Sequence, residues 1–326
     1  MKILVTGAAG FIGFHSSLRL LEAGHEVVGV DNLNDYYDVS LKTARLKLLS
    51  GFNSYCSKEL DLSNRAAIAT LFESMSFDAV LHLGAQAGVR YSIENPFAYI
   101  DSNVAGTLTV LEGCRNTGVA HLVYASSSSV YGANKKQPFA TSDRTDAPVS
   151  LYAATKKSNE LMCQTYAHLY RLPITGFRFF TVYGPWGRPD MAYFKFANAI
   201  MSEKPIDIYN RGQMERDFTY IDDIVDGLFK AVTSPALSAQ DKTPHRVYNL
   251  GNHRPEKLLD LVEILEHALG KRAEKNYLPM QPGDVISTFA DIGDAAADYG
   301  FKPKTSLSQG IERFADWYRD FYQLPK

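Results

Sequence analysis

The N-terminal thirteen residues contain the feature that most constrains the fold of this chain. Residues 3–5 read ILV, a short buried-strand pattern, and TGAAGFIG at residues 6–13 leads from it into helical spacing of apolar residues. Gly7 permits a tight turn, Gly10 lets a pyrophosphate approach the backbone, and Gly13 allows close packing of helix on strand. The segment therefore predicts a strand–turn–helix unit whose helix N-terminus binds the phosphates of a dinucleotide.

Short β-branched runs recur through the first 251 residues, with helical patterns between them. Their apolar residues are continuous rather than alternating, which is typical of strands buried on both faces of a parallel sheet. Residues 11–25 and 96–118 have helical spacing and reach a glycine near their ends. The sequence predicts an α/β fold with a doubly wound parallel sheet. The expected strands are ILV (3–5), VVGV (27–30), AVLHLGA (79–85), HLVYAS (121–126), ITGFRFF (174–180) and RVYNLG (246–251).

The pattern loosens after about residue 180, where Pro185, Gly187 and Pro189 interrupt it. We expect a smaller C-terminal α/β region that returns some strands to the sheet, and an exposed loop at 233–245. The helices expected there lie around 192–203, 222–233, 256–269 and 307–322.

Composition excludes several classes of function. The 326 residues are 45% apolar and 21% charged with a formal net charge of −2, which argues against a nucleic-acid partner. Cys56, Cys114 and Cys163 are far apart and lack zinc-ligand spacing, so we expect no metal site and a reducing, cytoplasmic location. No apolar run approaches the roughly 18 residues of a membrane span, and because the chain opens directly on a strand we expect no signal peptide.

Two aspartates are placed to contact a dinucleotide. Asp31 follows the second expected strand, 18 residues beyond Gly13. A carboxylate there accepts the adenosine ribose hydroxyls and repels a 2′-phosphate, which favours NAD over NADP; the alternative is a simple strand-end turn. Asp61, with Leu62, follows the third strand and is expected near the adenine amino group, unless it is a helix N-cap.

Tyr152 and Lys156 are spaced i, i+4 on one expected helix face, in SLYAATKKSNE (150–160). A phenol is a poor base because its ordinary pKa is about 10. A lysine ammonium one turn away favours the phenolate, so we expect Lys156 to lower the pKa of Tyr152. The motif alone is weak, but it gains weight after a dinucleotide fingerprint and a strand that ends in hydroxyls.

The sequence resembles the extended short-chain dehydrogenase/reductase superfamily and, within it, the nucleotide-sugar epimerases. The resemblance covers essentially the whole chain. It is carried by TGAAGFIG (6–13), Asp31, HLGAQAGVRYS (82–92), ASSSSVYG (125–132), Tyr152 with Lys156, RFFTVYGP (178–185) and RDFTYIDD (216–223). The fragments DNLNDYYDVSLK (31–42), AGVRYS (87–92) and TVYGPWGRPDMA (181–192) look most like the UDP-glucuronate 4-epimerase subgroup.

The resemblance implies a Ser-Tyr-Lys triad made of Ser127, Tyr152 and Lys156. Tyr152 would be the base, Lys156 would hold the nicotinamide ribose, and Ser127 would hydrogen-bond the reacting O4. It further implies a homodimer, a UDP-sugar substrate and bound NAD. The expected cofactor contacts are Gly7, Gly10, Phe11, Ile12, Gly13, Asp31, Asn32, Asp61, Leu62, Leu83, Ala85, Gln86, Ser102, Ser126, Tyr152, Lys156, Phe180 and Val182. Residues 1–180, with returning segments at about 217–252, would form the NAD-binding domain, and 181–216 with 253–326 the UDP-sugar-binding region.

A UDP-glucuronate epimerase must pass through a hazardous intermediate. With a ketone at C4 and a carboxylate on C5, the sugar is a β-keto acid that loses CO₂ when the C–CO₂ bond aligns with the carbonyl π system. Related decarboxylases carry an acid at the position of Ser129, and related 4,6-dehydratases an Asp-Glu pair at Ser128 and Ser129. Here both positions hold neutral donors, so we expect them to bind the carboxylate, with a charge-assisted contact from Arg188.

The remaining substrate contacts are expected from the same resemblance. Arg216 is expected at the diphosphate, or else in a surface ion pair. Arg90 faces the cofactor crevice or merely orders a loop. Phe194 and Phe196 line the uracil pocket or belong to the core. Thr181 replaces the Asn usual in UDP-galactose 4-epimerases, while Gln281 and Asp284 are expected near the nucleotide, although relatives often carry arginine in that stretch. His82 is expected to be structural.

Three alternatives to a UDP-glucuronate 4-epimerase stay open at this point. UDP-galactose 4-epimerase activity is disfavoured by Arg188, and a decarboxylase or dehydratase by the missing acids at Ser128 and Ser129. A non-catalytic NAD-binding regulator would have no need of the triad.

Overall fold

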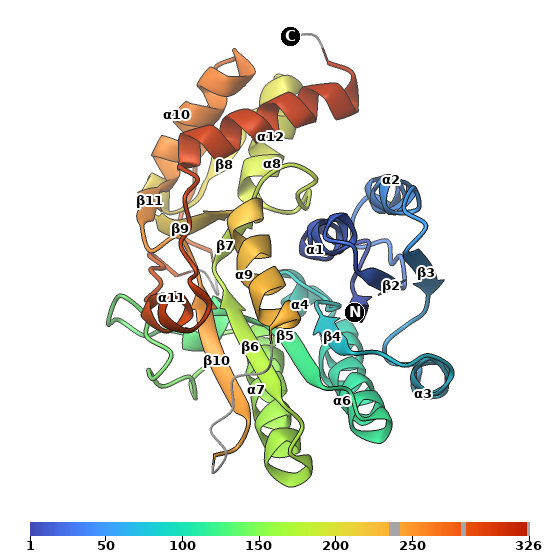
Figure 1. The fold of residues 1–326 in the computed structure, drawn as a ribbon. Coiled ribbons are helices and arrows are strands. Elements are labelled where there is room, and N and C mark those ends of the chain that lie inside the picture. Colours follow the sequence, from blue (N-terminus) through green and yellow to red (C-terminus); the bar gives the residue numbers. More distant parts are fainter. Residues whose placement is uncertain (235–241, 282–284, 325–326) are drawn as a thin grey trace.

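A seven-stranded parallel sheet is the framework of the computed structural model, which describes residues 1–234, 242–281 and 285–324 (Figure 1). The strand order is β10-β6-β5-β4-β1-β2-β3, and every neighbouring pair is parallel. The predicted doubly wound sheet is therefore confirmed. Its strands are β1 (Lys2–Thr6), β2 (Glu26–Asp31), β3 (Tyr55–Glu59), β4 (Ala79–His82), β5 (His121–Ser127), β6 (Ile174–Phe179) and β10 (His245–Leu250).

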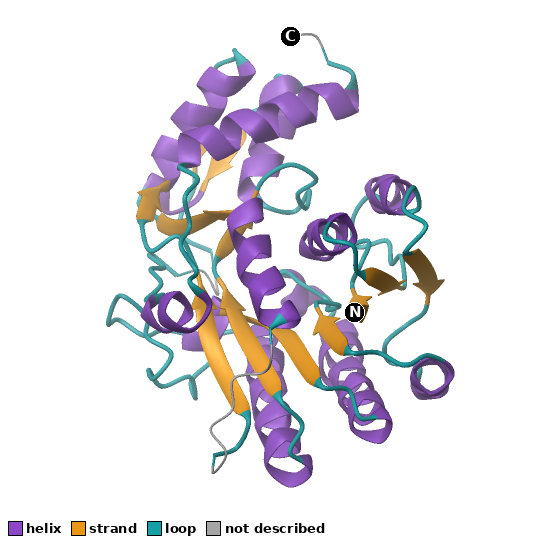
Figure 2. Cartoon of the chain, viewed as in Figure 1, coloured by secondary structure: helices purple, strands orange, loops and turns teal. Residues whose placement is uncertain are grey.

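Helices cover both faces of this sheet, which explains the continuous apolar strands (Figure 2). In β1, Ile3 and Val5 pack into one core with α1 and α9, while Leu4 faces a second core with α3, α6 and α7. The helices are α1 (Phe11–Glu22), α2 (Val39–Leu49), α3 (Arg65–Ser74), α4 (Tyr91–Glu94), α5 (Pro96–Tyr99), α6 (Gly106–Thr117), α7 (Leu151–Tyr170) and α9 (Ile221–Thr233).

The single helix expected at 96–118 is interrupted. A π-helical turn, η1 (Ile100–Ala105), separates α5 from α6. Within it, the Asn103 amide accepts a hydrogen bond from the Gln86 backbone N–H (2.8 Å) and donates to the Gln86 carbonyl (3.0 Å). Apolar spacing could not reveal this turn, because it depends on a polar side chain that bonds a loop next to the sheet's carboxyl edge.

The C-terminal region contributes two small sheets and a group of helices above the carboxyl ends of the main strands (Figure 1). Among the described residues, β7, β9 and β11 form one small sheet, and β8 pairs with β12. The expected helices occur within two residues of their predicted bounds. The elements are β7 (Thr181–Tyr183), α8 (Ala192–Met201), β8 (Ile206–Ile208), η3 (Tyr209–Gly212), β9 (Glu215–Tyr220), β11 (Pro255–Lys257), α10 (Leu258–Leu269), β12 (Lys275–Tyr277), α11 (Gly293–Tyr299) and α12 (Leu307–Tyr322).

The chain passes more than once between the main sheet and the C-terminal region. β10 forms the edge of the main sheet beside β6, and α9 packs against α1, whereas β9 belongs to a small sheet. The domain boundaries at residues 180 and 252 remain predictions. Part of the loop expected at 233–245 lies outside the described residues.

Candidate active site

A cavity of about 810 Å³ lies at the carboxyl ends of β1, β2, β4 and β5, between the main sheet and the C-terminal region. Strand order reverses at β1, which is where doubly wound sheets open a crevice for ligands. Every predicted cofactor contact lines this cavity. So do the predicted substrate contacts Arg90, Ser127, Ser128, Ser129, Thr181, Arg188 and Arg216.

The glycine turn forms the floor on the cofactor side. Gly7 has φ of +71°, and its carbonyl accepts the Gly10 N–H at 2.9 Å. A Cβ on Gly10 would lie 2.9 Å from that oxygen, and one on Gly13 would overlap it. Gly10 is the N-cap of α1 and offers no capping side chain, and Gly10, Phe11, Ile12 and Gly13 line the cavity, so a ligand there can reach the first N–H groups of the helix. This cradle fits a dinucleotide pyrophosphate.

Asp31 and Asp61 stand at adjacent strand ends. Asp31 accepts hydrogen bonds from the N–H groups of Ala9 (3.1 Å) and Leu33 (2.9 Å), which orient its carboxylate against the glycine turn. Asp61 accepts from the amide of Asn32 at 2.8 Å. Burial raises the pKa of Asp61, but hydrogen bonds from Ser63 and Asn32 outweigh it and lower the pKa. The N-cap of α3 is Asn64, so Asp61 does not serve the capping role considered above.

Tyr152 and Lys156 lie in the first turns of α7, whose N-cap is Ser150. The Lys156 Nζ donates to the Ala125 carbonyl at 2.9 Å, and burial lowers its pKa to about 8. Burial raises the pKa of Tyr152, while the Ser127 hydroxyl and the Arg188 guanidinium partly offset the rise. The expectation of a lowered phenol pKa is therefore not met by the protein's own groups, because desolvation is the larger effect.

The serine run at the end of β5 divides into different environments. Ser126 donates to Glu160 Oε1 at 2.7 Å, and Glu160 forms a bidentate pair with Arg178 through bonds of 2.8 and 2.9 Å. Ser127 caps the short 3₁₀ helix η2 (Ser128–Tyr131) by accepting the Ser129 N–H at 3.1 Å. All four serines line the cavity, but Ser126 is in addition tied to a buried ion pair.

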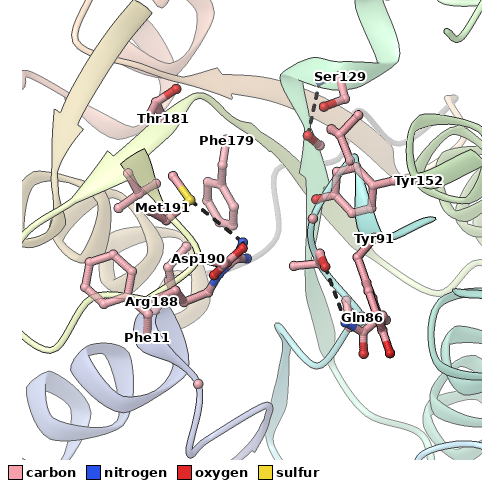
Figure 3. Close-up of a pocket in the computed structure, with 18 of the residues that line it drawn as sticks. Phe11, Gln86, Tyr91, Ser129, Tyr152, Phe179, Thr181, Arg188, Asp190 and Met191 are labelled. Carbon is pink, nitrogen blue, oxygen red and sulfur yellow. Dashed lines mark hydrogen bonds and ion pairs between the residues drawn. The ribbon is translucent and has the colours of Figure 1, made fainter. Parts of the chain in front are cut away.

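Arg188 has a protein partner that the sequence did not reveal. Its Nε and Nη2 donate to Oδ1 and Oδ2 of Asp190 at 2.9 and 2.7 Å, and the Tyr36 hydroxyl donates to Oδ2 at 3.2 Å. Figure 3 shows this pair projecting into the cavity, opposite the wall that carries Tyr152. Arg188 therefore lines the cavity as one member of an ion pair, and its expected contact with a substrate carboxylate stays a prediction.

The backbone just before Arg188 is fixed by the N-terminal half of the chain. His15 Nε2 lies 2.9 Å from the Pro185 carbonyl, and Arg45 Nη2 donates to the carbonyls of Trp186 (2.6 Å) and Gly187 (3.1 Å). The fully buried Arg45 also donates through Nη1 to the Ala9 carbonyl at 2.7 Å. Three consecutive carbonyls are thus held by side chains of α1 and α2, one of which also bonds the glycine turn.

The remaining predicted substrate contacts lie in different environments, some in the cavity wall and one in the core. Arg90 stacks its guanidinium 4.8 Å from the Tyr209 ring centroid, and Arg216 Nη1 donates to the Ile286 carbonyl at 3.0 Å. Phe196 lines the cavity, but Phe194 is fully buried against α12 and does not. The prediction of a ligand contact for Phe194 is thus corrected to its core alternative, because α8 turns that face toward α12.

Gln281, Asp284 and His82 lie apart from the cavity lining or beyond the described residues. Gln281 does not line the cavity, and Asp284 lies outside the described residues. His82 Nδ1 lies 2.8 Å from Thr6 Oγ1, which accepts the Gly84 N–H, and Nε2 lies 3.0 Å from Thr107 Oγ1. Burial lowers the pKa of His82 to about 3, consistent with a neutral structural histidine.

Several cavity residues were not predicted from the sequence. They lie largely in two fragments, 31–42 and 181–192, which resemble the UDP-glucuronate 4-epimerase subgroup. Tyr36, Tyr37 and Lys42 lie in 31–42, and Asp190 lies in 181–192. Contacts between these fragments, such as Tyr36 with Asp190, bring them together across the cavity. The resemblance of both fragments to one subgroup was the only sequence feature that could have indicated these residues.

Fold and site together define an enzyme that uses a dinucleotide for oxidation and reduction, with a hydroxyl, a phenol and a lysine at one crevice. Residues 3–251 match the NAD dependent epimerase/dehydratase family, and the chain belongs to that family.

The relatives extend over the full chain. A probable UDP-glucuronate 4-epimerase of Rhizobium meliloti is 49% identical, covering 99% of this chain and 98% of the relative. UDP-glucuronate 4-epimerase 1 of Arabidopsis thaliana is 50% identical over 99% of this chain and 77% of its own length. The crystal structure of UDP-glucuronic acid 4-epimerase from Bacillus cereus with UDP-glucuronic acid and NAD has a TM-score of 0.90 at 36% identity, covering 99% of this chain and 100% of the other.

Proposed function

We propose that this protein is an NAD-dependent 4-epimerase that interconverts UDP-glucuronate and UDP-galacturonate. The observation that carries the proposal is one cavity that joins a dinucleotide cradle, a half-buried Tyr152 and a run of uncharged donors, Ser127 to Ser129. The named relatives and the B. cereus complex support the same activity.

NAD would be held by the glycine turn, Asp31 and Lys156, and when bound it supplies the hydride acceptor and donor for C4 of the sugar. The reaction is redox-neutral overall. The protein's own task is therefore to bind the sugar, to move the O4 proton, and to protect the 4-keto sugar from side reactions.

Tyr152 is the proposed base. It takes the O4 proton as C4 becomes a ketone, and returns it to O4 when the opposite face of C4 is reduced. Ser127, which hydrogen-bonds the phenol and partly offsets its raised pKa, would also hold O4. Lys156 would supply positive charge beside the ribose, and its bond to the Ala125 carbonyl fixes it at the end of β5.

Ser128, Ser129 and Thr181 are the proposed carboxylate ligands. A carboxylate bound by hydroxyl donors keeps its charge solvated, and it can be held out of line with the C4 carbonyl π system. The intermediate then returns to a 4-hydroxy sugar before CO₂ is lost. An acid at either serine would instead repel the uronate.

An NMR time course with UDP-glucuronate tests this function. Signals of UDP-galacturonate are expected, with NAD bound throughout. UDP-pentose signals alone would mean decarboxylation, and an unchanged spectrum would refute a catalytic role on this substrate. UDP-galactose run in parallel tests the hexose alternative.

We also propose a homodimer formed through α6 and α7. These helices pack side by side and expose Leu108 (38%), Leu161 (57%) and Leu169 (61%). Light scattering after size exclusion should show a dimer that Leu161→Glu dissociates. Leu48→Glu, at an apolar position on α2 that is 48% exposed, is the matched control, and equal behaviour of the two variants would contradict the interface.

The described part of the chain contains no helix long and apolar enough to cross a membrane. A cytoplasmic location remains part of the proposal, supported by the free thiols of Cys56, Cys114 and Cys163. Cell fractionation with a tagged full-length chain tests it.

A further inference from the structure

Asp190 occupies an unusual position for an acid in a cavity proposed to bind an anionic sugar. It lines the cavity with an exposed side-chain fraction of 20%, and both of its oxygens are engaged. Oδ1 accepts Arg188 Nε, and Oδ2 accepts both Arg188 Nη2 and the Tyr36 hydroxyl. Burial raises the pKa of Asp190, but Arg188 and Tyr36 outweigh it and lower the pKa, so the carboxylate stays charged.

The bond pattern determines what Arg188 can offer to a ligand. A guanidinium binds a carboxylate best through two parallel N–H bonds, and Asp190 already takes the pair formed by Nε and Nη2. Nη2 also lies 3.8 Å from Met191 Sδ, so its second hydrogen is directed there and Nη1 has no free neighbour with which to form another parallel pair. A substrate carboxylate could use those donors only by displacing Asp190, which would leave an unpaired carboxylate in a mostly buried position. It would also meet the negative charge of Asp190 itself.

The pair is held from both sides, so it is a built feature of the cavity wall. Tyr36 reaches Asp190 from the loop after β2, and its ring packs 4.7 Å from that of Tyr91. His15 and Arg45 hold the carbonyls of the three residues before Arg188. The backbone that carries Arg188 is thus fixed, and Asp190 cannot leave Arg188 without also losing its bond from Tyr36.

We propose that Asp190 is a positioning residue that sets substrate specificity by occupying the Arg188 fork and directing the substrate carboxylate to Ser128, Ser129 and Thr181. Arg188 then acts as a fixed positive group facing Tyr152 rather than as a carboxylate ligand. This inference rests on the proposed function, since it concerns where a uronate carboxylate binds.

Replacement of Asp190 by Asn tests the inference through binding rather than turnover. Calorimetry on the NAD-loaded protein compares UDP-glucuronate with UDP-glucose, which lacks the carboxylate. Freed of its charged partner, Arg188 should capture the uronate, and the affinity ratio of UDP-glucuronate to UDP-glucose should rise about tenfold, or about 1.4 kcal/mol. Asp190→Asn/Arg188→Met should abolish the gain.

A matched control is available on the surface. Arg144 and Asp146 form a similar pair two residues apart, with side chains 86% and 60% exposed, and Asp146 does not line the cavity. Asp146→Asn should leave the ratio unchanged. If Asp190→Asn fails to fold, Asp190→Ser removes the same charge with a smaller side chain.

The outcomes separate cleanly. An unchanged affinity ratio of UDP-glucuronate to UDP-glucose in a folded Asp190 variant overturns the inference, because Arg188 then gains no ligand. A lower ratio also overturns it, because Arg188 then already bound the substrate carboxylate while paired with Asp190. A gain that persists without Arg188 also overturns it, since simple loss of repulsion would explain the change. Failure of the wild type to epimerise UDP-glucuronate by NMR would instead refute the proposed function, whatever the binding ratios.

Discussion

The buried pair of Glu160 and Arg178 behind the serine run gives the sharpest stability prediction. Both side chains are about 95% buried, with exposed fractions of 4% and 5%. Glu160 Oε1 accepts from Ser126 Oγ and Arg178 Nε, and Oε2 accepts from Arg178 Nη2. Glu160→Gln keeps the shape but leaves the guanidinium without its negative partner.

The magnitude follows from that burial. Removing one member of a buried pair costs about 3–5 kcal/mol, because the other charge stays desolvated. For a chain of 326 residues, the entropy of unfolding is about 0.7 kcal/mol/K near 60 °C, so Tm should fall by about 4–7 °C. Differential scanning calorimetry at pH 7 measures this fall. Asp146→Asn, in the exposed Arg144 pair, is the control and should cost about 0–1 kcal/mol.

The pH dependence of this effect has a definite sign. Burial raises the pKa of Glu160, but Arg178 outweighs it and the net pKa is lowered. A carboxyl with a depressed folded pKa stabilises the fold above its unfolded pKa, about 4.3. That contribution is lost as the pH falls through the folded pKa. The Tm difference between wild type and Glu160→Gln should therefore narrow below about pH 4.3. A Tm loss under about 1 °C at pH 7, or a difference that widens in acid, would refute this account of the pair.

The other predictions concern the cavity. Tyr152→Phe should lower kcat about 10²–10⁴-fold while calorimetry still detects UDP-glucuronate binding; retained turnover would exclude Tyr152 as the base. Gly13→Ala places a Cβ on the Gly7 carbonyl oxygen, so NAD affinity measured by fluorescence titration should fall at least about tenfold. Gly24→Ala is the control, because a Cβ there has open space but φ is +82°; it should lower stability without a selective loss of NAD affinity. Arg188→Met removes a cation that lowers the pKa of Tyr152, so the acid limb of the kcat–pH profile should move to higher pH; movement to lower pH would contradict the coupling.

The fold could be predicted from the sequence because the apolar pattern of each strand is local. Ile3, Leu4 and Val5 are all apolar since alternate residues enter two different cores, as in a sheet that helices cover on both faces. The glycine turn could be predicted for the same reason. Gly7, Gly10 and Gly13 meet within one turn, so the steric reason for each is local.

The site was less accessible where its contacts depend on folding. Arg188 and Phe194 show two different limits. The residue type of Arg188 fits a substrate carboxylate or Asp190 equally well, and only the fold shows which acid reaches its fork. Phe194 and Phe196 are two residues apart on α8, and sequence spacing did not show which side α12 would cover.

The contacts of Arg45 connect the two halves of the site. A fully buried guanidinium that donates to carbonyls and a phenol is costly to bury, so its bonds must stabilise a specific arrangement. On one side it bonds Ala9, whose N–H bonds Asp31 beside the expected adenosine ribose. On the other side it bonds Trp186 and Gly187, immediately before Arg188. The position of Arg188 relative to Tyr152 thus depends on the same α2 side chain that orders the glycine turn. The cofactor and sugar ends of the cavity share one rigid framework, which is what a reaction at a single carbon between them requires.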